Sequence, residues 1–335
     1  MATNEMKALA KLHPREGLWM THAPVPEIGP EGQARLAKRI PVAQDITAEA
    51  DSGGHTDNQS ALALIPTLIA LRDQIQERHG YRQTLRVGAA GGISTPISAA
   101  AALSMGAAYI LTGSINQACV EAGTSDIVRK MLADAEQADI TMAPAADMFE
   151  MGVKVQVLKR GTMFAMRAQK LYELYRACDS LDSIPKTDMA VLEKSTFRAP
   201  VDVVWTQCRN FFADRDPAQL ERAAKDPKHK MSLVFRWYLG QSSHWANAGD
   251  PTRVIDYQIW CGPAMGAFNG WVKGSFLEEP EERSVVKIEF CVEREHVTFL
   301  GHEARIDLDL RSVETAESTV EYRQEMHGLF QHIAL

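Results

Sequence analysis

The segment that decides the fold reads Glu49-Ala-Asp-Ser-Gly-Gly-His-Thr-Asp57, in which His55 follows two glycines at the end of an apolar run. Residues 42–50 read as a buried strand, and two later apolar runs, 85–90 and 109–112, also end in glycine. Each run is followed by a segment with helical spacing, so the pattern predicts an α/β fold with a parallel sheet covered by helices. Loops at the carboxyl ends of such strands carry ligands, because the strands hold them rigid. This edge is therefore the predicted functional site.

The first half of the chain divides into a lead-in and an α/β unit. Residues 1–40 are rich in proline, glycine and charge, so they read as a lead-in segment and not as a domain. Residues 41–142 form the predicted α/β unit. Its helices are expected at 58–78, 96–105 and 125–137.

The second half changes character twice. Residues 143–283 are predicted to form a helical domain, whereas the alternating residues 284–335 are predicted to form a strand-like tail with hairpins. In that tail Ile306 and Leu308 point one way and Asp307 the other. The helices of the middle domain are expected at 163–176, 192–197, 201–212, 217–225 and 230–245.

Composition limits the classes of partner. The 335 residues carry a net charge of −7 and no run of five basic residues, which argues against binding to nucleic acid or to an anionic membrane. The five cysteines are scattered and never form a Cys-x-x-Cys pair, so neither a disulfide framework nor a structural zinc site is expected. A reducing cytoplasm suits this pattern. The apolar stretch 97–112 falls short of the ~20 residues of a membrane-spanning helix.

Two dipeptides that contain glycine suggest a phosphate site. Gly91-Gly92 and Gly113-Ser114 each end a predicted strand, and they stand about twenty residues apart, the spacing of consecutive strand–helix units. Backbone N–H groups of two such turns hold a phosphate, because glycine permits close approach. Glycine is also common in these turns for steric reasons alone. The two pairs together favour the phosphate site.

His55 is the candidate acid or base. Imidazole titrates near neutral pH and exchanges protons with a carbon next to an activating group, and Gly53 and Gly54 allow close approach of a substrate. Glu49, Asp51 and Asp57 place carboxylates near it in sequence, and Asp57 is a candidate to orient the ring. The alternative is a structural histidine that caps the following helix or hydrogen-bonds Asp57. The chain contains no Gly-x-Ser-x-Gly, His-Glu-x-x-His or P-loop motif.

Several long runs, in order from residue 34 to about 283, resemble a known family. They include Val87-Gly-Ala-Ala-Gly-Gly-Ile93, Leu111-Thr-Gly-Ser-Ile-Asn-Gln117, Ala143-Pro-Ala-Ala-Asp-Met-Phe-Glu-Met-Gly152 and Asp256-Tyr-Gln-Ile-Trp-Cys-Gly-Pro-Ala-Met-Gly-Ala-Phe-Asn269. These runs and the Gly-Gly-His segment resemble the PfaD-type enoyl reductases, flavin-dependent subunits of polyunsaturated fatty acid synthases with relatives acting in trans on polyketide synthases. The α/β unit is more distantly similar to nitronate monooxygenases.

The resemblance implies the C-terminal part of a TIM (β/α)8 barrel that binds FMN, followed by the helical domain. It implies that NADPH reduces the flavin and that a trans-2-enoyl thioester on acyl carrier protein is the substrate, with His55 as the active-site histidine. Other synthase subunits are the implied partners. The residues assigned to the flavin are Glu49, Ser52, Gly53, Ala90, Gly91, Gly92, Gly113 and Ser114.

The chain departs from the family at both ends. Forty residues before Pro41 cannot hold five further strand–helix units, so we expect a fragment whose barrel is completed by an N-terminal chain or by a homodimer. The alternating tail differs from the helical ending of the family. Two other functions therefore stay open: a nitronate monooxygenase-like flavin oxidase, and an inactive module that docks on a synthase.

Overall fold

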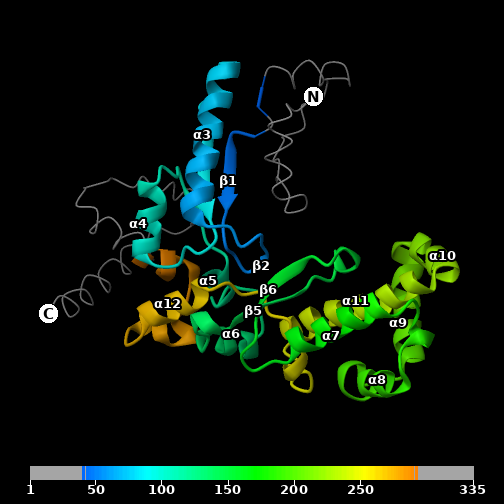
Figure 1. The fold of residues 1–335 in the computed structure, drawn as a ribbon. Coiled ribbons are helices and arrows are strands. Elements are labelled where there is room, and N and C mark those ends of the chain that lie inside the picture. Colours follow the sequence, from blue (N-terminus) through cyan, green and yellow to red (C-terminus); the bar gives the residue numbers. More distant parts are fainter. Residues whose placement is uncertain (1–39, 42, 290, 293–335) are drawn as a thin grey trace.

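A parallel three-stranded sheet stands at the centre of the first half of the protein. The computed structural model describes residues 40–41, 43–289 and 291–292 (Figure 1). The strand order is β1-β3-β4, with Ala48 opposite Ala89 and Ala89 opposite Ile110. The predicted α/β class and the three predicted strands are confirmed, with bounds β1 Asp45–Glu49, β3 Arg86–Ala90 and β4 Ile110–Leu111.

The predicted helices follow these strands, and their ends have local causes. Thr95 caps α4 by accepting from the N–H of Ser98, and Pro96 occupies the first helical position, where its missing N–H costs nothing. Gly80 ends α3 in the left-handed region, at φ 57°. The bounds are α3 Ala61–His79, α4 Pro96–Ser104, α5 Ser114–Gln117 and α6 Asp126–Ala133.

A second, antiparallel sheet was not predicted. Its order is β2-β6-β5, with His55 opposite Val155 and Ala143 opposite the same Val155 on the other side. The domain boundary expected at 142/143 falls inside β5, so the α/β unit and the second half share this sheet. The bounds are β2 Gly54–His55, β5 Ile140–Pro144 and β6 Lys154–Leu158. The described strands form two separate sheets, and the barrel stays a prediction.

The helical part follows β6 and contains the five expected helices. Asp226 caps the longest of them by accepting from the N–H of His229, and that helix ends at Gly249 in the left-handed region. In Figure 1 this part extends away from the sheets as a group of long helices. Its elements are α7 Phe164–Ala177, η3 Leu181–Ser183, α8 Lys186–Val191, the π-helix η4 Leu192–Phe197, α9 Val201–Arg215, α10 Pro217–Lys225 and α11 Pro227–Ala248.

The chain then returns to the parallel sheet. Tyr257, Met265 and Phe268 are fully buried in the same apolar core as the strand residues Val87 and Ala89. A second core lies between α7, α9, α11 and β6. Residues from both halves of the sequence therefore build the core beneath the glycine turns. The returning elements are η5 Val254–Asp256, α12 Ala264–Val272, η6 Phe276–Glu278 and η7 Pro280–Glu282.

The beginning of the tail is helical, so the strand prediction for residues 284–335 is wrong there. Residues 285–289 and 291–292 are in α-helix. Ile288, Cys291 and Val292 are buried in the first core at three- and four-residue spacing, which is the helical period and outweighs any alternation. The alternating residues from Arg305 on lie outside the described residues. Within the part that the structure describes, no helix is long and apolar enough to cross a membrane.

Candidate active site

A short hydrogen-bonded loop places His55. Gly54 and His55 form β2 against β6, and Gly54 takes the left-handed conformation at φ 80°. A Cβ at Gly54 would lie 2.8 Å from the ring of Trp260, so no larger residue fits there without displacing that ring. Because residue 54 is a glycine, the indole of Trp260 can lie against the loop.

The side chain of Gln156, in β6, is hydrogen-bonded to this loop. Its buried side chain donates to Asp51 Oδ1 at 2.9 Å and to the carbonyl of Ser52 at 2.7 Å, and it accepts from Asn58. Asn58 also donates to Asp51 Oδ1, which supports its left-handed backbone at φ 52°. The loop is therefore held by a side chain of β6 and by its own polar side chains, as a rigid support for a reacting group requires.

The two predicted glycine turns lie next to this loop. Gly91 and Gly92 have φ of 80° and 76°, and a Cβ at Gly91 would lie 2.7 Å from the backbone of Ala50. Gly92 and Gly113 are exposed. A Cβ at Gly113 would meet no atom within 4 Å, so open space lies above that turn.

Gly262 joins the Gly113-Ser114 turn to the His55 loop, and sequence reasoning did not single it out. Its N–H donates to Ser114 Oγ at 3.0 Å, and a Cβ on it would lie 2.8 Å from the nitrogen of Gly53. The turn after β4, the loop after β1 and the segment before α12 therefore meet at one point. In Figure 1 the labels of β2, β6 and α5 lie together at the centre of the molecule.

His55 has two close side-chain neighbours. Its Nε2 lies 3.0 Å from Asp147 Oδ1, and its ring meets that of Trp260 edge to face, with centroids 5.3 Å apart. Asp57, the predicted partner, is exposed, and the carboxylate recorded at the ring is that of Asp147. The expectation for Asp57 is therefore wrong: Asp57 lies beyond β2, where the chain turns toward α3, while the end of β5 brings Asp147 to the imidazole.

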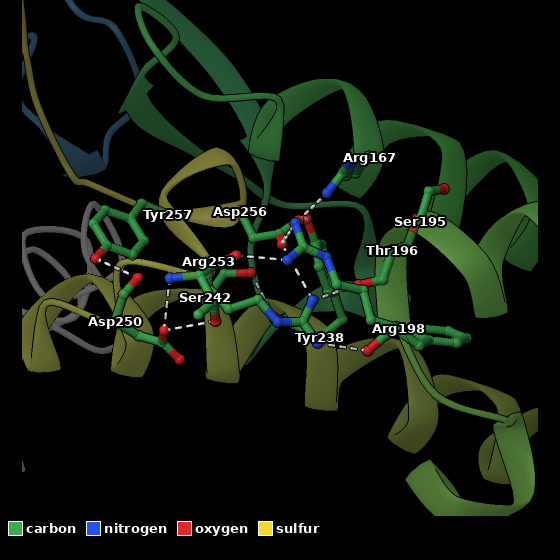
Figure 2. Close-up of polar contacts among 12 residues, drawn as sticks. Arg167, Ser195, Thr196, Arg198, Tyr238, Ser242, Asp250, Arg253, Asp256 and Tyr257 are labelled. Carbon is green, nitrogen blue, oxygen red and sulfur yellow. Dashed lines mark hydrogen bonds and ion pairs between the residues drawn. The ribbon is translucent and has the colours of Figure 1, made fainter.

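A buried carboxylate supports the segment that carries Trp260 and Gly262. Asp256 is fully buried and lies among three arginines, pairing with Arg167 and, at 3.2 and 3.3 Å, with Arg253 and Arg198 (Figure 2). Tyr238 donates to it at 2.9 Å. Because one carboxylate ties α7, α11 and the end of η4 together, the helical part fixes where the 256–262 segment begins.

Most residues predicted for the flavin meet at one edge. Ala50 N–H donates to the carbonyl of Ala90, Ser52 Oγ donates to Glu49 at 2.6 Å, and Gly53 reaches Ser114 through Gly262. The residues that sequence reasoning missed as neighbours are Asp147, Gln156, Trp260 and Gly262. Asp147, Trp260 and Gly262 stand in the long runs that carry the family resemblance, and this was the available signal.

The glycine turns fit a phosphate group. Among the described residues, the N–H groups of Gly92 and Ser114 donate to no protein acceptor. Free N–H groups beside open space are the donors that an anion requires. The residues present are therefore compatible with the phosphate end of FMN at Gly92, Gly113 and Ser114.

Another hollow lies far along the helical part. A surface pocket of about 450 Å³ between α9, α10 and α11 is lined by Trp205, Arg209, Leu220, Ala223, Ala224 and Lys230. Lys230 stands near the start of α11, whereas Trp245 near its end contacts both cores. None of the lining residues belongs to the His55 loop or to the glycine turns, so this pocket is distinct from the edge that carries His55.

The chain is similar in sequence to proteins of fatty acid and polyketide synthesis. It is 50% identical over 289 residues to a component of the polyunsaturated fatty acid synthase of Thraustochytrium sp., covering 83% of this chain and 19% of that protein. It is 48% identical over 256 residues to the polyketide biosynthesis protein PksE of Bacillus subtilis, covering 76% of this chain and 33% of PksE. The chain thus spans a third or less of these relatives.

A solved structure supports the same relationship. The enoyl reductase domain of MlnA, from the macrolactin biosynthesis cluster of Bacillus amyloliquefaciens, is 41% identical, with a TM-score of 0.76. The match covers 81% of this chain and 60% of that domain. The homologues of this chain are therefore polyunsaturated fatty acid synthase subunits and polyketide biosynthesis proteins, and its structural neighbour is an enoyl reductase domain.

One family model points to a different enzyme. Residues 178–257 match the inserted helical domain of [acyl-carrier-protein] S-malonyltransferase. This range runs from η3 through α11 to η5 and leaves out the glycine turns and His55. The match therefore concerns the helical part alone.

Proposed function

We propose that this chain is the catalytic part of an FMN-dependent enoyl reductase of the PfaD type, acting in polyunsaturated fatty acid or polyketide synthesis. The observation that carries the proposal is that the His55 loop lies against the Gly91-Gly92 turn at Ala50 and is joined to the Gly113-Ser114 turn by Gly262. Its 41% identity to an enoyl reductase domain supports the choice of reaction. NADPH is the proposed reductant, and a trans-2-enoyl thioester on acyl carrier protein the proposed substrate.

Two turns of this chain would hold the cofactor. Gly92 and Gly113 leave room for the phosphate, and the N–H groups of Gly92 and Ser114 would donate to it. The chemistry that bound FMN supplies is hydride transfer from NADPH to the β-carbon of the enoyl thioester. A TIM barrel, completed by another chain or by a second copy, would surround the remainder of the cofactor.

His55 would supply the proton. Reduction of a carbon–carbon double bond adds a hydride at one carbon and a proton at the other, and the thioester carries the negative charge in between. The imidazole of His55 lies at the edge where the turns meet, and its ring packs edge to face against the indole of Trp260. His55 is thus the proposed acid for the α-carbon.

The helical part would serve this reaction without adding a transferase. The chain has no Gly-x-Ser-x-Gly motif, so nothing in it supports a serine nucleophile for malonyl transfer. Its homologues are subunits of synthases. We therefore propose acyl carrier protein and other synthase subunits as its partners.

Flavin binding is the decisive test. FMN added to the purified chain, with and without a co-expressed upstream segment of the barrel, should show quenched flavin fluorescence, and NADPH plus crotonyl-acyl carrier protein should then yield the butyryl thioester. Gly113→Asp should weaken FMN binding at least tenfold, because its carboxylate would occupy the open space and repel the phosphate.

Gly123→Asp is the matched control, since a Cβ there also meets no atom within 4 Å. It should bind FMN like the unaltered chain. Failure of the assembled protein to bind FMN or to reduce the thioester would instead favour the docking module. Oxygen consumption with a nitroalkane in place of thioester reduction would favour the flavin oxidase.

A further inference from the structure

The contact between His55 and Asp147 joins two edges of the second sheet. His55 belongs to β2 and Asp147 follows β5, and these strands lie on opposite sides of β6. Their side chains nevertheless meet at 3.0 Å although 92 residues separate them. The two side chains are 19% and 42% exposed, so the pair lies where a substrate could reach the ring.

A second side chain also contacts the ring of His55. Trp260 meets it edge to face, at an interplanar angle of 83°. The backbone of Trp260 is itself held in place, because it pairs with Val157 of β6 and its carbonyl accepts from Gln117 at 2.9 Å. Contacts at one nitrogen and at the ring therefore restrict rotation of the imidazole about its side-chain bonds.

The chemistry of the contact selects one ring nitrogen. An ionised carboxylate only accepts hydrogen bonds, so Nε2 must carry a proton when it faces Asp147. Within the described residues, the side-chain hydrogen bond recorded for His55 is the one at Nε2, and none is recorded at Nδ1. In the neutral ring Nδ1 is then the lone-pair nitrogen, and in the protonated ring it is the N–H that can be given away.

We infer that Asp147 is a positioning residue, which holds His55 in its Nε2–H form so that Nδ1 handles the proton. The assignment of a proton donor role to His55 rests on the proposed function, whereas the tautomer and its dependence on Asp147 do not. Asp147 acts through His55 and need not touch the substrate. This division of roles is the one that a buried carboxylate has toward the histidine of a hydrolase triad.

The tautomer can be measured without any turnover. In the full chain with 15N-labelled histidine, at a pH where the ring is neutral, we expect Nε2 of His55 to show the shift of a protonated nitrogen and Nδ1 that of a lone-pair nitrogen. His55→Gln assigns the signals by their loss. In Asp147→Ala the 15N shifts of both ring nitrogens of His55 should move toward the averaged values of a tautomer mixture. The shifts of His79 and His244 should not change.

Kinetics provide the second readout. Asp147→Ala should lower kcat with crotonyl-acyl carrier protein at least tenfold and leave KM within twofold, because orientation of the acid matters for the chemical step alone. Asp147→Glu should restore part of kcat, since it returns a carboxylate. Asp214→Ala, at an exposed aspartate of α9, is the control and should match the unaltered protein.

The outcomes separate this inference from the proposed function. A wild-type His55 protonated at Nδ1, or tautomer shifts unchanged in both Asp147→Ala and Asp147→Leu, would overturn it. Absence of enoyl reduction by the unaltered protein would overturn the proposed function, and the nitrogen shifts would then still decide the role of Asp147. Thermal unfolding of each variant shows whether it is folded, and Asp147→Leu, which cannot accept a hydrogen bond, serves if the alanine variant is not.

Discussion

The N–H of Gly262 donates a hydrogen bond of 3.0 Å to Ser114 Oγ, across 148 residues of sequence. This bond connects the turn after β4 to the segment that carries Trp260. The same glycine lies against the backbone of Ser52 and Gly53. One position thus sets the spacing between the histidine loop and a turn of the proposed phosphate site.

Gly262→Ala should disturb both the fold and the proposed cofactor site. Its Cβ would lie 2.8 Å from Gly53 N and 3.1 Å from Ser52 C, which are backbone atoms that cannot rotate away. We expect a loss of about 1–3 kcal/mol in the free energy of unfolding, measured with urea, and weaker FMN binding. Gly270→Ala, inside α12 and with no atom within 4 Å of its Cβ, should keep or slightly raise stability. Equal free energies of unfolding for the two variants would contradict the close contact of Gly262 with Gly53.

Asp256→Ala should lower the free energy of unfolding far more than removal of a surface carboxylate does. It would leave Arg167, Arg198 and Arg253, which are partly buried, without the fully buried carboxylate that they share, at a cost of about 3–5 kcal/mol. Asp188→Ala is the control, because its pair with Lys170 is partly exposed and contributes at most about 1 kcal/mol. Urea unfolding followed by tryptophan fluorescence measures both. A cost for Asp256→Ala as small as that of the control would show that the cluster adds no net stability.

The parallel sheet and its edge could be predicted because their signals are local. Each strand is a short apolar run that ends in glycine, and Pro96 marks the start of α4. The phosphate turns follow from the same pattern, since the ends of neighbouring parallel strands must lie together. The expectation that His55 lies at this edge needed no long-range information.

The second sheet and the partners of His55 could not be predicted in this way. Its strand β2 has only two residues, too few to show a period in the sequence, and β6 buries four of its five residues, Gln156 included. Asp147 and Trp260 reach the imidazole through pairings across the chain that no spacing in the sequence reveals. The start of the tail was mispredicted because burial of Ile288 and Cys291 against the first core decides its structure.

His229 should make stability depend on pH. The ring is 3% exposed, Nε2 contacts Gln219 at 2.9 Å, and burial, followed by the charge of Arg222, lowers the pKa of His229 below its ordinary value of 6.5. The unfolded chain then binds the proton more readily, so this contribution is complete above about pH 6.5 and is lost as the pH falls through the folded pKa. His229→Gln should show a smaller drop in urea midpoint between pH 7.5 and 5.5 than the unaltered protein.

His244→Gln is the control, because it also removes a histidine but not a buried one. His244 lies exposed on the same helix, α11, so its removal should leave the pH dependence of the urea midpoint unchanged. If His229→Gln kept the full drop between the two pH values, other groups would have to account for the acid sensitivity.

Thiol labelling should report opening of the segment around Gly262. All five cysteines are buried and none forms a disulfide within the described residues, and burial raises the pKa of Cys119, Cys208 and Cys261 to about 12. The reactive thiolate is therefore scarce at pH 8, and reagent reaches it only when the structure opens. We expect a disulfide reagent to label these three thiols at least a hundredfold more slowly in the native protein than in urea, as mapped by mass spectrometry.

A positive control and a local comparison make this test specific. Ser104→Cys adds an exposed thiol at the end of α4 and should react at once under native conditions. Cys208 lies in the second core, whereas Cys261 adjoins Gly262, so Gly262→Ala should speed labelling of Cys261 and leave that of Cys208 unchanged. Rapid native labelling of Cys261 in the unaltered protein would mean that the 256–262 segment opens on its own. The close contact between Gly53 and Gly262 would then be too short-lived to hold the glycine turns in place.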